Sequence, residues 1–203
     1  MTVSFWEKDI ICLFTDGGLV TPNPSKLGGT WAWCGVSKDG EHVREVSAYL
    51  LPNTSNCPGN PRVNSDTITN NDVEFYADLR ALESMKDGWS GILATDSRIT
   101  IERLQKCRQG LVPSVFRMDW YSRAHSAFER LGDVRMIQLV GHPNQKELEQ
   151  GFKILEDGTK AKVSRHNVWC DQTCTELAKT YEYRVLGWQT YVQQGIPDDA
   201  LKK

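Results

Sequence analysis

Hydrophobic and polar positions along the chain follow patterns that predict both strands and helices. Short apolar or alternating runs, typical of strands, cover residues 9–14, 29–37, 41–51, 91–95 and 134–140. Apolar residues three or four positions apart, typical of one helix face, cover residues 69–85, 97–108, 113–131 and 164–183. We interpret residues 15–18, Thr-Asp-Gly-Gly, as a turn that ends the first strand.

The order of these elements predicts an α/β protein. The first three strands follow one another through short turns, so they should lie antiparallel. A first strand that meets later ones across helices implies a five-stranded mixed sheet, three antiparallel strands and then two parallel, flanked by helices on both faces. We expect one domain over residues 1–185, long insertions at 52–67 and 143–163, and a C-terminal tail over 186–203. Within the second insertion, Asp157-Gly158 predicts a small exposed hairpin.

The composition is that of an ordinary globular protein. Hydrophobic residues make up 39% and charged residues 25% of the 203 positions, which suits one domain with a packed core. No leader-like segment opens the sequence and no apolar run approaches 18 residues, so we expect neither a signal peptide nor a membrane partner. Six cysteines without CxxC pairs are typical of reduced thiols in an intracellular, cytoplasmic protein. They are Cys12, Cys34, Cys57, Cys107, Cys170 and Cys174.

Four carboxylates stand beside apolar residues. Asp16 and Asp96 each follow an apolar strand, Glu74 lies early in its helix among small residues, and Asp171 falls in the predicted apolar stripe of the last helix. Taken singly, each is compatible with a turn residue or a partner of the helix dipole. Together they would repel one another unless divalent cations neutralised them, and oxygen ligands favour Mg²⁺ or Mn²⁺ over zinc. The sequence therefore predicts a candidate acidic metal site.

Five short motifs occur in order between about residue 9 and residue 180. They are Phe14-Thr15-Asp16-Gly17-Gly18 with Asn23-Pro24, Thr69-Asn70-Asn71-Asp72-Val73-Glu74, Thr95-Asp96-Ser97, Val140-Gly141-His142, and Asn167-x-x-Cys170-Asp171. In this order and on these elements, they resemble the motifs of type 1 ribonuclease H. One such motif would be weak, whereas five on matching elements are specific. The two insertions are longer than in compact members of that family.

The resemblance implies a ribonuclease H-like fold and a metal-dependent endonuclease that cuts the RNA strand of RNA–DNA hybrids, leaving 5′-phosphate and 3′-hydroxyl ends. It implies two Mg²⁺ ions, with Mn²⁺ as a substitute, bridged by Asp16. Glu74 and Asp96 would hold the ion that generates the nucleophile, and Asp171 the other. His142 would assist proton transfer or product departure. Substrate-binding positions implied by the family pattern are Gly17, Asn23, Thr69, Asn70, Asn71 and Ser97. We expect a monomer without a small-molecule cofactor.

Other interpretations compete with this one. A nuclease of the same superfamily that acts on DNA would carry similar acids, and a non-catalytic nucleic-acid-binding module would keep only the fold. Zinc binding by Cys170, Cys174 and His166 is a further alternative, although no fourth ligand is evident. Basic residues that could grip the substrate are Lys106, Arg108, Arg117 and Arg123, near Trp120 and Tyr121, or else the insertion lysines Lys146, Lys153, Lys160 and Lys162.

The charge balance argues, at first, mildly against a polyanionic partner. The chain has 24 basic and 26 acidic residues, a net charge of −2. If the four candidate acids face metal ions, the remaining 22 acids stand against the 24 basic residues. We therefore expect local phosphate contacts in place of a broad basic face.

Overall fold

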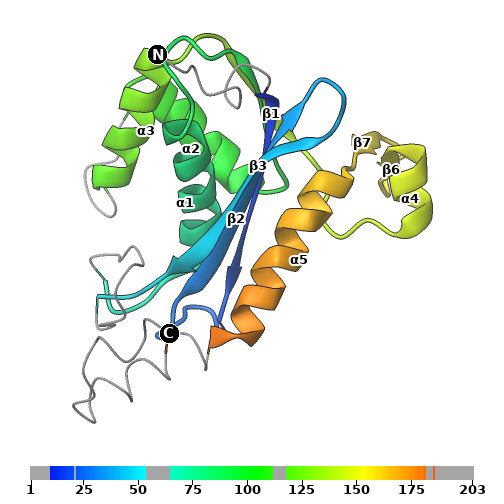
Figure 1. The fold of residues 1–203 in the computed structure, drawn as a ribbon. Coiled ribbons are helices and arrows are strands. Elements are labelled where there is room, and N and C mark those ends of the chain that lie inside the picture. Colours follow the sequence, from blue (N-terminus) through cyan, green and yellow to red (C-terminus); the bar gives the residue numbers. More distant parts are fainter. Residues whose placement is uncertain (1–9, 21, 54–64, 112–117, 182–184, 186–203) are drawn as a thin grey trace, which may run out of the picture.

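A five-stranded sheet forms the centre of the molecule (Figure 1). The computed structural model describes residues 10–20, 22–53, 65–111, 118–181 and 185. The strands are β1 (Ile10–Leu19), β2 (Gly29–Ser37), β3 (His42–Leu50), β4 (Gly91–Thr95) and β5 (Val134–Gln138), in the order β3-β2-β1-β4-β5. The first three strands are antiparallel, while β4 runs parallel to both β1 and β5. The predicted mixed sheet is confirmed.

Helices cover both faces of this sheet, as predicted. Figure 1 shows α1 (Asn70–Glu83), α2 (Arg98–Arg108) and α3 (Met118–Arg130) on one side and α5 (Arg165–Lys179) on the other. Side chains of β1 pack against the helices on both faces of the sheet, because successive side chains of a strand point to opposite faces. Leu13 packs in the core beneath α1, α2 and α3, whereas Cys12 and Phe14 pack in the cluster beneath α5. The central strand is therefore buried on both sides.

Polar side chains cap the starts of α1 and α2. Thr69 caps α1 through a capping box. The Thr69 side chain accepts a hydrogen bond from the Asp72 N–H, and the Asp72 side chain accepts one from the Thr69 N–H. Ser97 caps α2 by accepting a hydrogen bond from the backbone N–H of Thr100. The Ser97 hydroxyl also donates to Glu74 of α1 at 2.5 Å, so the starts of α1 and α2 lie close together.

The first strand continues through the segment that the sequence predicts to be a turn. Residues 15–18 remain paired with β2, so the prediction of a turn there is wrong. The physical reason lies in packing: a Cβ on Gly17 would meet backbone atoms of Val73 and Glu74 at 2.6 Å. The glycine is needed for the close approach of α1 to β1. That approach places Glu74 beside the strand that carries Asp16.

An arm of residues 144–163 extends beyond the N-terminal end of α5 (Figure 1). It contains the short helix α4 (Gln145–Gln150) and a ribbon of two antiparallel strands, β6 (Phe152–Ile154) and β7 (Lys160–Lys162). The ribbon confirms the predicted hairpin. Helix α4 was not predicted, although Asn144 and Glu147 form a capping box at its start. We refer to residues 144–163 as the arm.

Two predicted segments lie outside the described residues: most of the first insertion, residues 54–64, and the C-terminal tail, residues 186–203. At the described margins of that insertion, the Asn53 N–H donates to the Ser65 carbonyl, and Ser25 pairs with Ile68. Within the ranges given above, no helix is both long enough and apolar enough to cross a membrane.

The close contact at Gly17 makes a testable prediction. Gly17→Ala should lower the free energy of unfolding by about 1–3 kcal/mol, because neither the strand nor the helix backbone can move away cheaply. Gly18→Ala is the matched control, since its Cβ would meet only the Thr30 Oγ1 at 3.3 Å and the Cys174 Cβ at 3.5 Å. Urea unfolding of both variants measures the difference. Equal stability of the two variants would contradict the close-packing argument.

Candidate active site

Asp16 lies at the centre of the predicted acidic cluster. It is 8% exposed, and its Oδ1 accepts a hydrogen bond of 2.7 Å from the Gly17 N–H. Burial raises the pKa of Asp16 well above its usual range, and the charges of Asp96, Asp171 and Glu74 raise it further. All three predicted neighbours are therefore near enough to act on Asp16 electrostatically.

Two neutral donors from different elements hold Glu74. The Asn70 amide donates to Oε1 at 2.6 Å, and the Ser97 hydroxyl donates to Oε2 at 2.5 Å. Burial raises the pKa of Glu74, while these two hydrogen bonds oppose the shift by favouring the charged form. Two of the predicted substrate-binding residues are thus engaged with the predicted metal-binding carboxylate.

Asp96 follows β4 directly, as predicted, and lies between β4 and α5. The Asn167 amide donates to Asp96 Oδ2 at 3.4 Å. Burial raises the pKa of Asp96, whereas the Asn167 hydrogen bond and the nearby His142 act in the opposite direction. Asn167, which is 3% exposed, is a site residue whose contact with Asp96 the sequence did not predict. Its position one helical turn before Asp171 is the signal that could have indicated it.

Asp171 lies at the edge of the buried stripe of α5 and not within it. The buried residues of that helix are Asn167, Cys170 and Cys174, so the prediction that Asp171 falls within the apolar stripe is wrong. The side chain of Asp171 is 38% exposed, and its Oδ2 lies 3.7 Å from Nδ1 of His142. This edge position leaves a carboxylate oxygen open to solvent beside the other acids.

His142 is an exposed side chain on a backbone of unusual conformation. Its φ of 49° lies in the left-handed region, which few residues other than glycine adopt. The side chain is 83% exposed and faces Asp171 through Nδ1. The preceding residue, Gly141, lies so close to Asp96 that an added Cβ would meet Oδ2 at 2.5 Å. The predicted histidine loop therefore passes directly beside the acidic cluster.

The donor set suits a hard divalent cation. Carboxylate oxygens are the ligands of Mg²⁺ and Mn²⁺, and the raised pKa values of Asp16 and Asp96 show that their negative charges are not fully compensated. In the described part of the chain, no three His, Cys, Asp or Glu side chains are already gathered closely enough to hold one ion. Ion binding would therefore draw the carboxylates closer together.

The other predicted substrate-binding residues occupy different places. The hydroxyl of Thr69 donates to Asp72 at 2.8 Å in the capping box, and the Asn71 carbonyl accepts a hydrogen bond from Arg103 at 3.4 Å. Asn23 is exposed in the connection between β1 and β2, and within the described ranges it makes no hydrogen bond to the acids. Of the whole predicted set, Gly17, Asn70 and Ser97 bind a member of the cluster directly.

The zinc alternative has no support in the described residues. The thiols of Cys170 and Cys174 are buried and donate to the carbonyls of Phe14 at 3.4 Å and Asp16 at 3.5 Å. His166 is hydrogen-bonded to His42, at 2.8 Å. Burial raises the pKa of both thiols. Five of the six cysteines are buried and free, which agrees with the predicted reduced thiols, and Cys57 lies outside the described residues.

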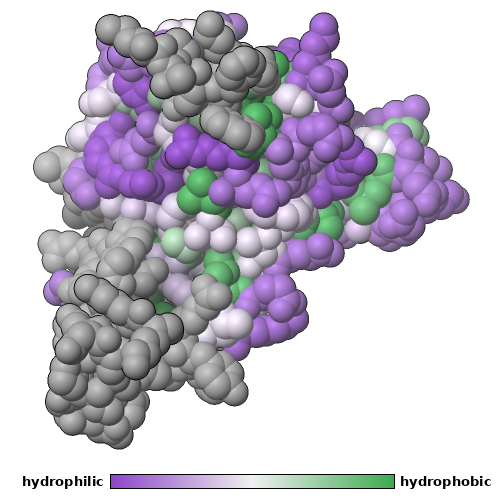
Figure 2. Space-filling model, viewed as in Figure 1, coloured by the Kyte–Doolittle hydropathy of each residue, from purple (hydrophilic) through white to green (hydrophobic). Residues whose placement is uncertain are grey.

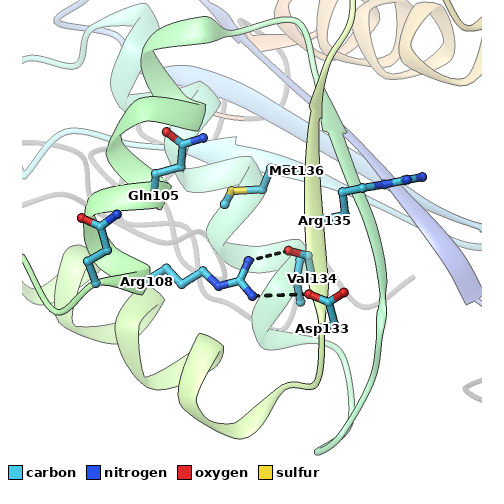
Figure 3. Close-up of a pocket in the computed structure, with 7 residues that line it drawn as sticks. Gln105, Arg108, Asp133, Val134, Arg135 and Met136 are labelled. Carbon is cyan, nitrogen blue, oxygen red and sulfur yellow. Dashed lines mark hydrogen bonds and ion pairs between the residues drawn. The ribbon is translucent and has the colours of Figure 1, made fainter.

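Most of the residues on α2 and α3 that the sequence suggested for substrate binding are buried or bound to other residues of the protein. Arg123 forms two hydrogen bonds with Glu83, at 2.7 and 2.8 Å, and Trp120 and Tyr121 are buried. Arg108 lines a cavity of ≈ 320 Å³ at the start of β5 and donates to the Val134 carbonyl at 2.9 Å (Figure 3). This cavity lies at the end of β4 and β5 opposite to Asp96, because Gly91 pairs with Val134. Arg117 lies outside the described residues.

Asp78 is a buried acid that the sequence did not single out. It is 0% exposed, one helical turn after Glu74 on α1, and Oδ1 accepts a hydrogen bond from the Thr15 hydroxyl. Its other oxygen has no hydrogen-bond partner among the described residues. Burial raises the pKa of Asp78 to about 8, with Glu74 and Asp96 adding to the rise. Its position among the apolar residues of α1 is the sequence signal that could have identified it.

Comparisons with known proteins identify the fold. No protein-family model and no curated protein sequence matches the chain. The chain is similar in structure to the N-terminal RNase H domain of rv2228c from Mycobacterium tuberculosis, with a TM-score of 0.54 and 11% identity over 87% of this chain and 98% of that one. It is also similar to LC11-RNase H1, isolated from compost by a metagenomic approach, with a TM-score of 0.51 and 18% identity over 85% and 97% of the two chains.

A structure of LC11-RNase H1 in complex with an RNA/DNA hybrid also matches, with a TM-score of 0.45 and 20% identity over 66% of this chain and 88% of that one. The fold thus belongs to the class of α/β proteins with a mixed five-stranded sheet and helices on both faces. Within that class, the chain has the ribonuclease H-like fold, which confirms the fold implied by the sequence motifs.

The buried carboxyl of Asp78 predicts a pH-dependent stability. The unfolded chain loses this proton near the usual pKa of 3.8, and the folded chain keeps it until about pH 8. The folded state therefore binds an extra proton in this window, so its stability falls as the pH rises, by up to about 1.4 kcal/mol per pH unit. Asp78→Asn cannot ionise and should flatten this decline.

Denaturant unfolding between pH 5 and pH 8 measures the decline. Asp87→Asn is the matched control, because the side chain of Asp87 is 85% exposed. This variant should keep the dependence of stability on pH that the unaltered protein shows. If Asp78→Asn and the control retain the same slope, Asp78 does not hold a proton in the folded protein.

Proposed function

We propose that the chain is a metal-dependent endoribonuclease that hydrolyses the RNA strand of RNA–DNA hybrids. The observation that carries the proposal is the set of acids around Asp16, whose pKa is raised first by burial and then by three neighbouring carboxylates. A cluster of uncompensated acids at the end of parallel strands suits divalent cations and a phosphodiester substrate. The ribonuclease H-like fold supports the same assignment.

We assign the ions to four carboxylates. Asp16 would bridge two Mg²⁺ or Mn²⁺ ions, Glu74 and Asp96 would hold one, and Asp171 the other. Ions bound there would activate the attacking water and stabilise the charge on the leaving oxygen. The water oxygen forms the new bond to phosphorus as the bond to the 3′ oxygen breaks. The products are a 5′-phosphate and a 3′-hydroxyl.

The remaining residues orient these carboxylates and transfer protons. Asn70 and Ser97 hold both oxygens of Glu74 by donating to them, and Asn167 holds Oδ2 of Asp96. His142 faces Asp171 through Nδ1, so its Nε2 is the atom we assign to exchange protons with the leaving group and solvent. Its exposure suits a group that must reprotonate from water in every turnover.

The substrate assignment rests on the polar residues near the acids. The wide minor groove of an A-form-like duplex displays 2′-hydroxyl groups that amide and hydroxyl side chains can test. Asn70 and Ser97 stand at the cluster and are the residues we assign to this contact, together with Gly17, Asn23, Thr69 and Asn71 from the family pattern. Buried free cysteines support an intracellular setting, which we propose to be the cytoplasm, and we propose that the protein acts as a monomer.

A cleavage assay tests the proposal. The protein is incubated with Mg²⁺ or Mn²⁺ and with labelled RNA–DNA hybrid, duplex RNA, duplex DNA or single strands. We expect cleavage of only the RNA strand of the hybrid, with 3′-hydroxyl products. Asp16→Asn should lower the rate by at least about 10²-fold, because it removes the carboxylate shared by both ions. Asp87→Asn, an exposed acid, should retain full activity.

The other outcomes identify the competing functions. Equal cleavage of duplex DNA would favour a DNA nuclease of the same fold and would exclude hybrid specificity. A folded protein that binds nucleic acid but cleaves none of the substrates with either metal would be a non-catalytic binding module.

Thermal unfolding provides an independent test of the metal site. We expect Mg²⁺ to raise the Tm of the unaltered protein, because a bound cation relieves carboxylate repulsion in the folded state only. Asp16→Asn should raise the Tm in the absence of metal, by about 2–4 °C for each kcal/mol of repulsion relieved, and should remove most of the response to Mg²⁺. Asp87→Asn should respond to Mg²⁺ like the unaltered protein. The absence of any Mg²⁺ effect on Tm or activity would contradict the four-carboxylate site.

A further inference from the structure

We propose that the β6–β7 ribbon of the arm binds the phosphate backbone of the duplex substrate beside the active site. The inference rests on the proposed function and adds a binding surface that the family motifs do not include. Figure 2 shows the arm as a mainly hydrophilic projection at one side of the molecule. Its position, the composition of its faces and the partners of its charged residues support the proposal.

The arm is connected to the active site at both of its ends. It begins directly after the loop of His142 and leads into α5, which carries Asn167 and Asp171. The Val140 N–H, two residues before His142, donates to the Lys162 carbonyl on β7 at 2.8 Å. The ribbon is therefore fixed to the strand end from which the histidine loop departs. A duplex bound at the acidic cluster would extend past this part of the surface.

One face of the ribbon is both basic and apolar. The register places Phe152 opposite Lys162 and Ile154 opposite Lys160, so these four side chains share a face. The Lys160 Nζ lies 4.6 Å from the centre of the Phe152 ring, and Ile154 is 53% exposed. Lys153 lies on the opposite face, across from Ala161, and is bound to Glu147 at 3.8 Å.

Three of the four acids of the arm are engaged away from this face, and the fourth, Glu156, is exposed in the turn between β6 and β7. Glu147 caps α4 and binds Lys153, Glu149 accepts a hydrogen bond from Gln145, and Asp157 accepts one from the Thr159 N–H. Lys160 and Lys162 are exposed, and neither forms an ion pair with any residue in the described ranges. The arm has balanced charge overall, and two of its three lysines that form no ion pair within the described ranges lie on β7.

Charge complementarity favours phosphate as the occupant. Two unpaired ammonium groups on an extended strand attract a polyanion, and they stand beside a site proposed to cut a phosphodiester chain. The apolar part of the face, Phe152 and Ile154, supports the lysine stems and excludes water from the contact. Phosphate contacts carry no sequence information, so this surface would hold the duplex in position without selecting its sequence.

Binding measurements with two double variants test the proposal. The probe is a labelled RNA–DNA hybrid, and Asp16→Asn is present in every protein so that no cleavage occurs. Lys160→Glu with Lys162→Glu should weaken binding several-fold and should reduce the slope of log affinity against log salt by about 1–2, as expected for the loss of two phosphate contacts. Lys38→Glu with Lys86→Glu is the matched control, because it makes the same charge change at two exposed lysines outside the arm.

Kinetics with active protein provide a second readout. In the absence of Asp16→Asn, the arm variant should raise KM while kcat stays near that of the unaltered protein, because the ribbon does not touch the reacting atoms. The thermal midpoint of each variant shows that the fold is retained. Unchanged affinity and salt slope in the arm variant would overturn the proposal. An equal loss in the Lys38 and Lys86 control would also overturn it, because net charge alone would then explain the effect.

Failure of this inference can be distinguished from failure of the proposed function. If the unaltered protein cleaves hybrids and the arm variant binds them equally well, only the arm proposal is wrong. If the unaltered protein cleaves no substrate, the proposed function fails, while the anisotropy of a labelled hybrid still reports whether the ribbon binds duplex phosphates.

Discussion

Mutual repulsion among carboxylates gathered around the buried Asp16 is the constraint on which the functional end of this molecule depends. Burial and three acidic neighbours all disfavour the charged form of Asp16. The fold holds the acids with neutral donors more than with cations: Asn70 and Ser97 each donate to one oxygen of Glu74. Neutral donors orient a carboxylate without cancelling its charge. The cluster therefore keeps the negative potential that a divalent cation would need, at the cost of stability while no ion is bound.

The contact between α1 and β1 determines how closely two of these acids approach. Gly17 permits the helix backbone to lie against the strand, and so places Glu74 beside Asp16. The same helix contributes Asp78, which is bound to the hydroxyl of Thr15. Because burial raises the pKa of Asp78 to about 8, this second carboxyl is neutral at pH 7 and adds little repulsion. One helix thus supplies a charged acid to the site and an uncharged one to the core beneath it.

Most of the fold, and the places of Glu74 early in a helix and Asp96 at the end of a strand, could be predicted because they follow from local patterns. Alternating strands and hairpin turns indicated the mixed sheet. What the sequence did not indicate depends on partners distant along the chain. Gly17 resembles a turn residue until the helix that covers it is known, and Asn167 is ordinary until Asp96 lies beside it. Asp78 was missed for the same reason, since only the packed structure shows that it is fully buried.

Charge distribution, more than net charge, explains how a chain of net charge −2 could bind a polyanion. Four acids lie at the candidate metal site, where cations would offset them, and two lie on α4, where capping, an ion pair and a hydrogen bond engage them. Two lysines that form no ion pair within the described residues lie on β7, which is bonded to the strand end before the loop of His142. Because screening limits electrostatic attraction to about 8–10 Å in physiological salt, a phosphate group near Lys160 or Lys162 would respond to these local charges more than to the total. Substrate affinity would then depend on metal and salt together, through two separate surfaces.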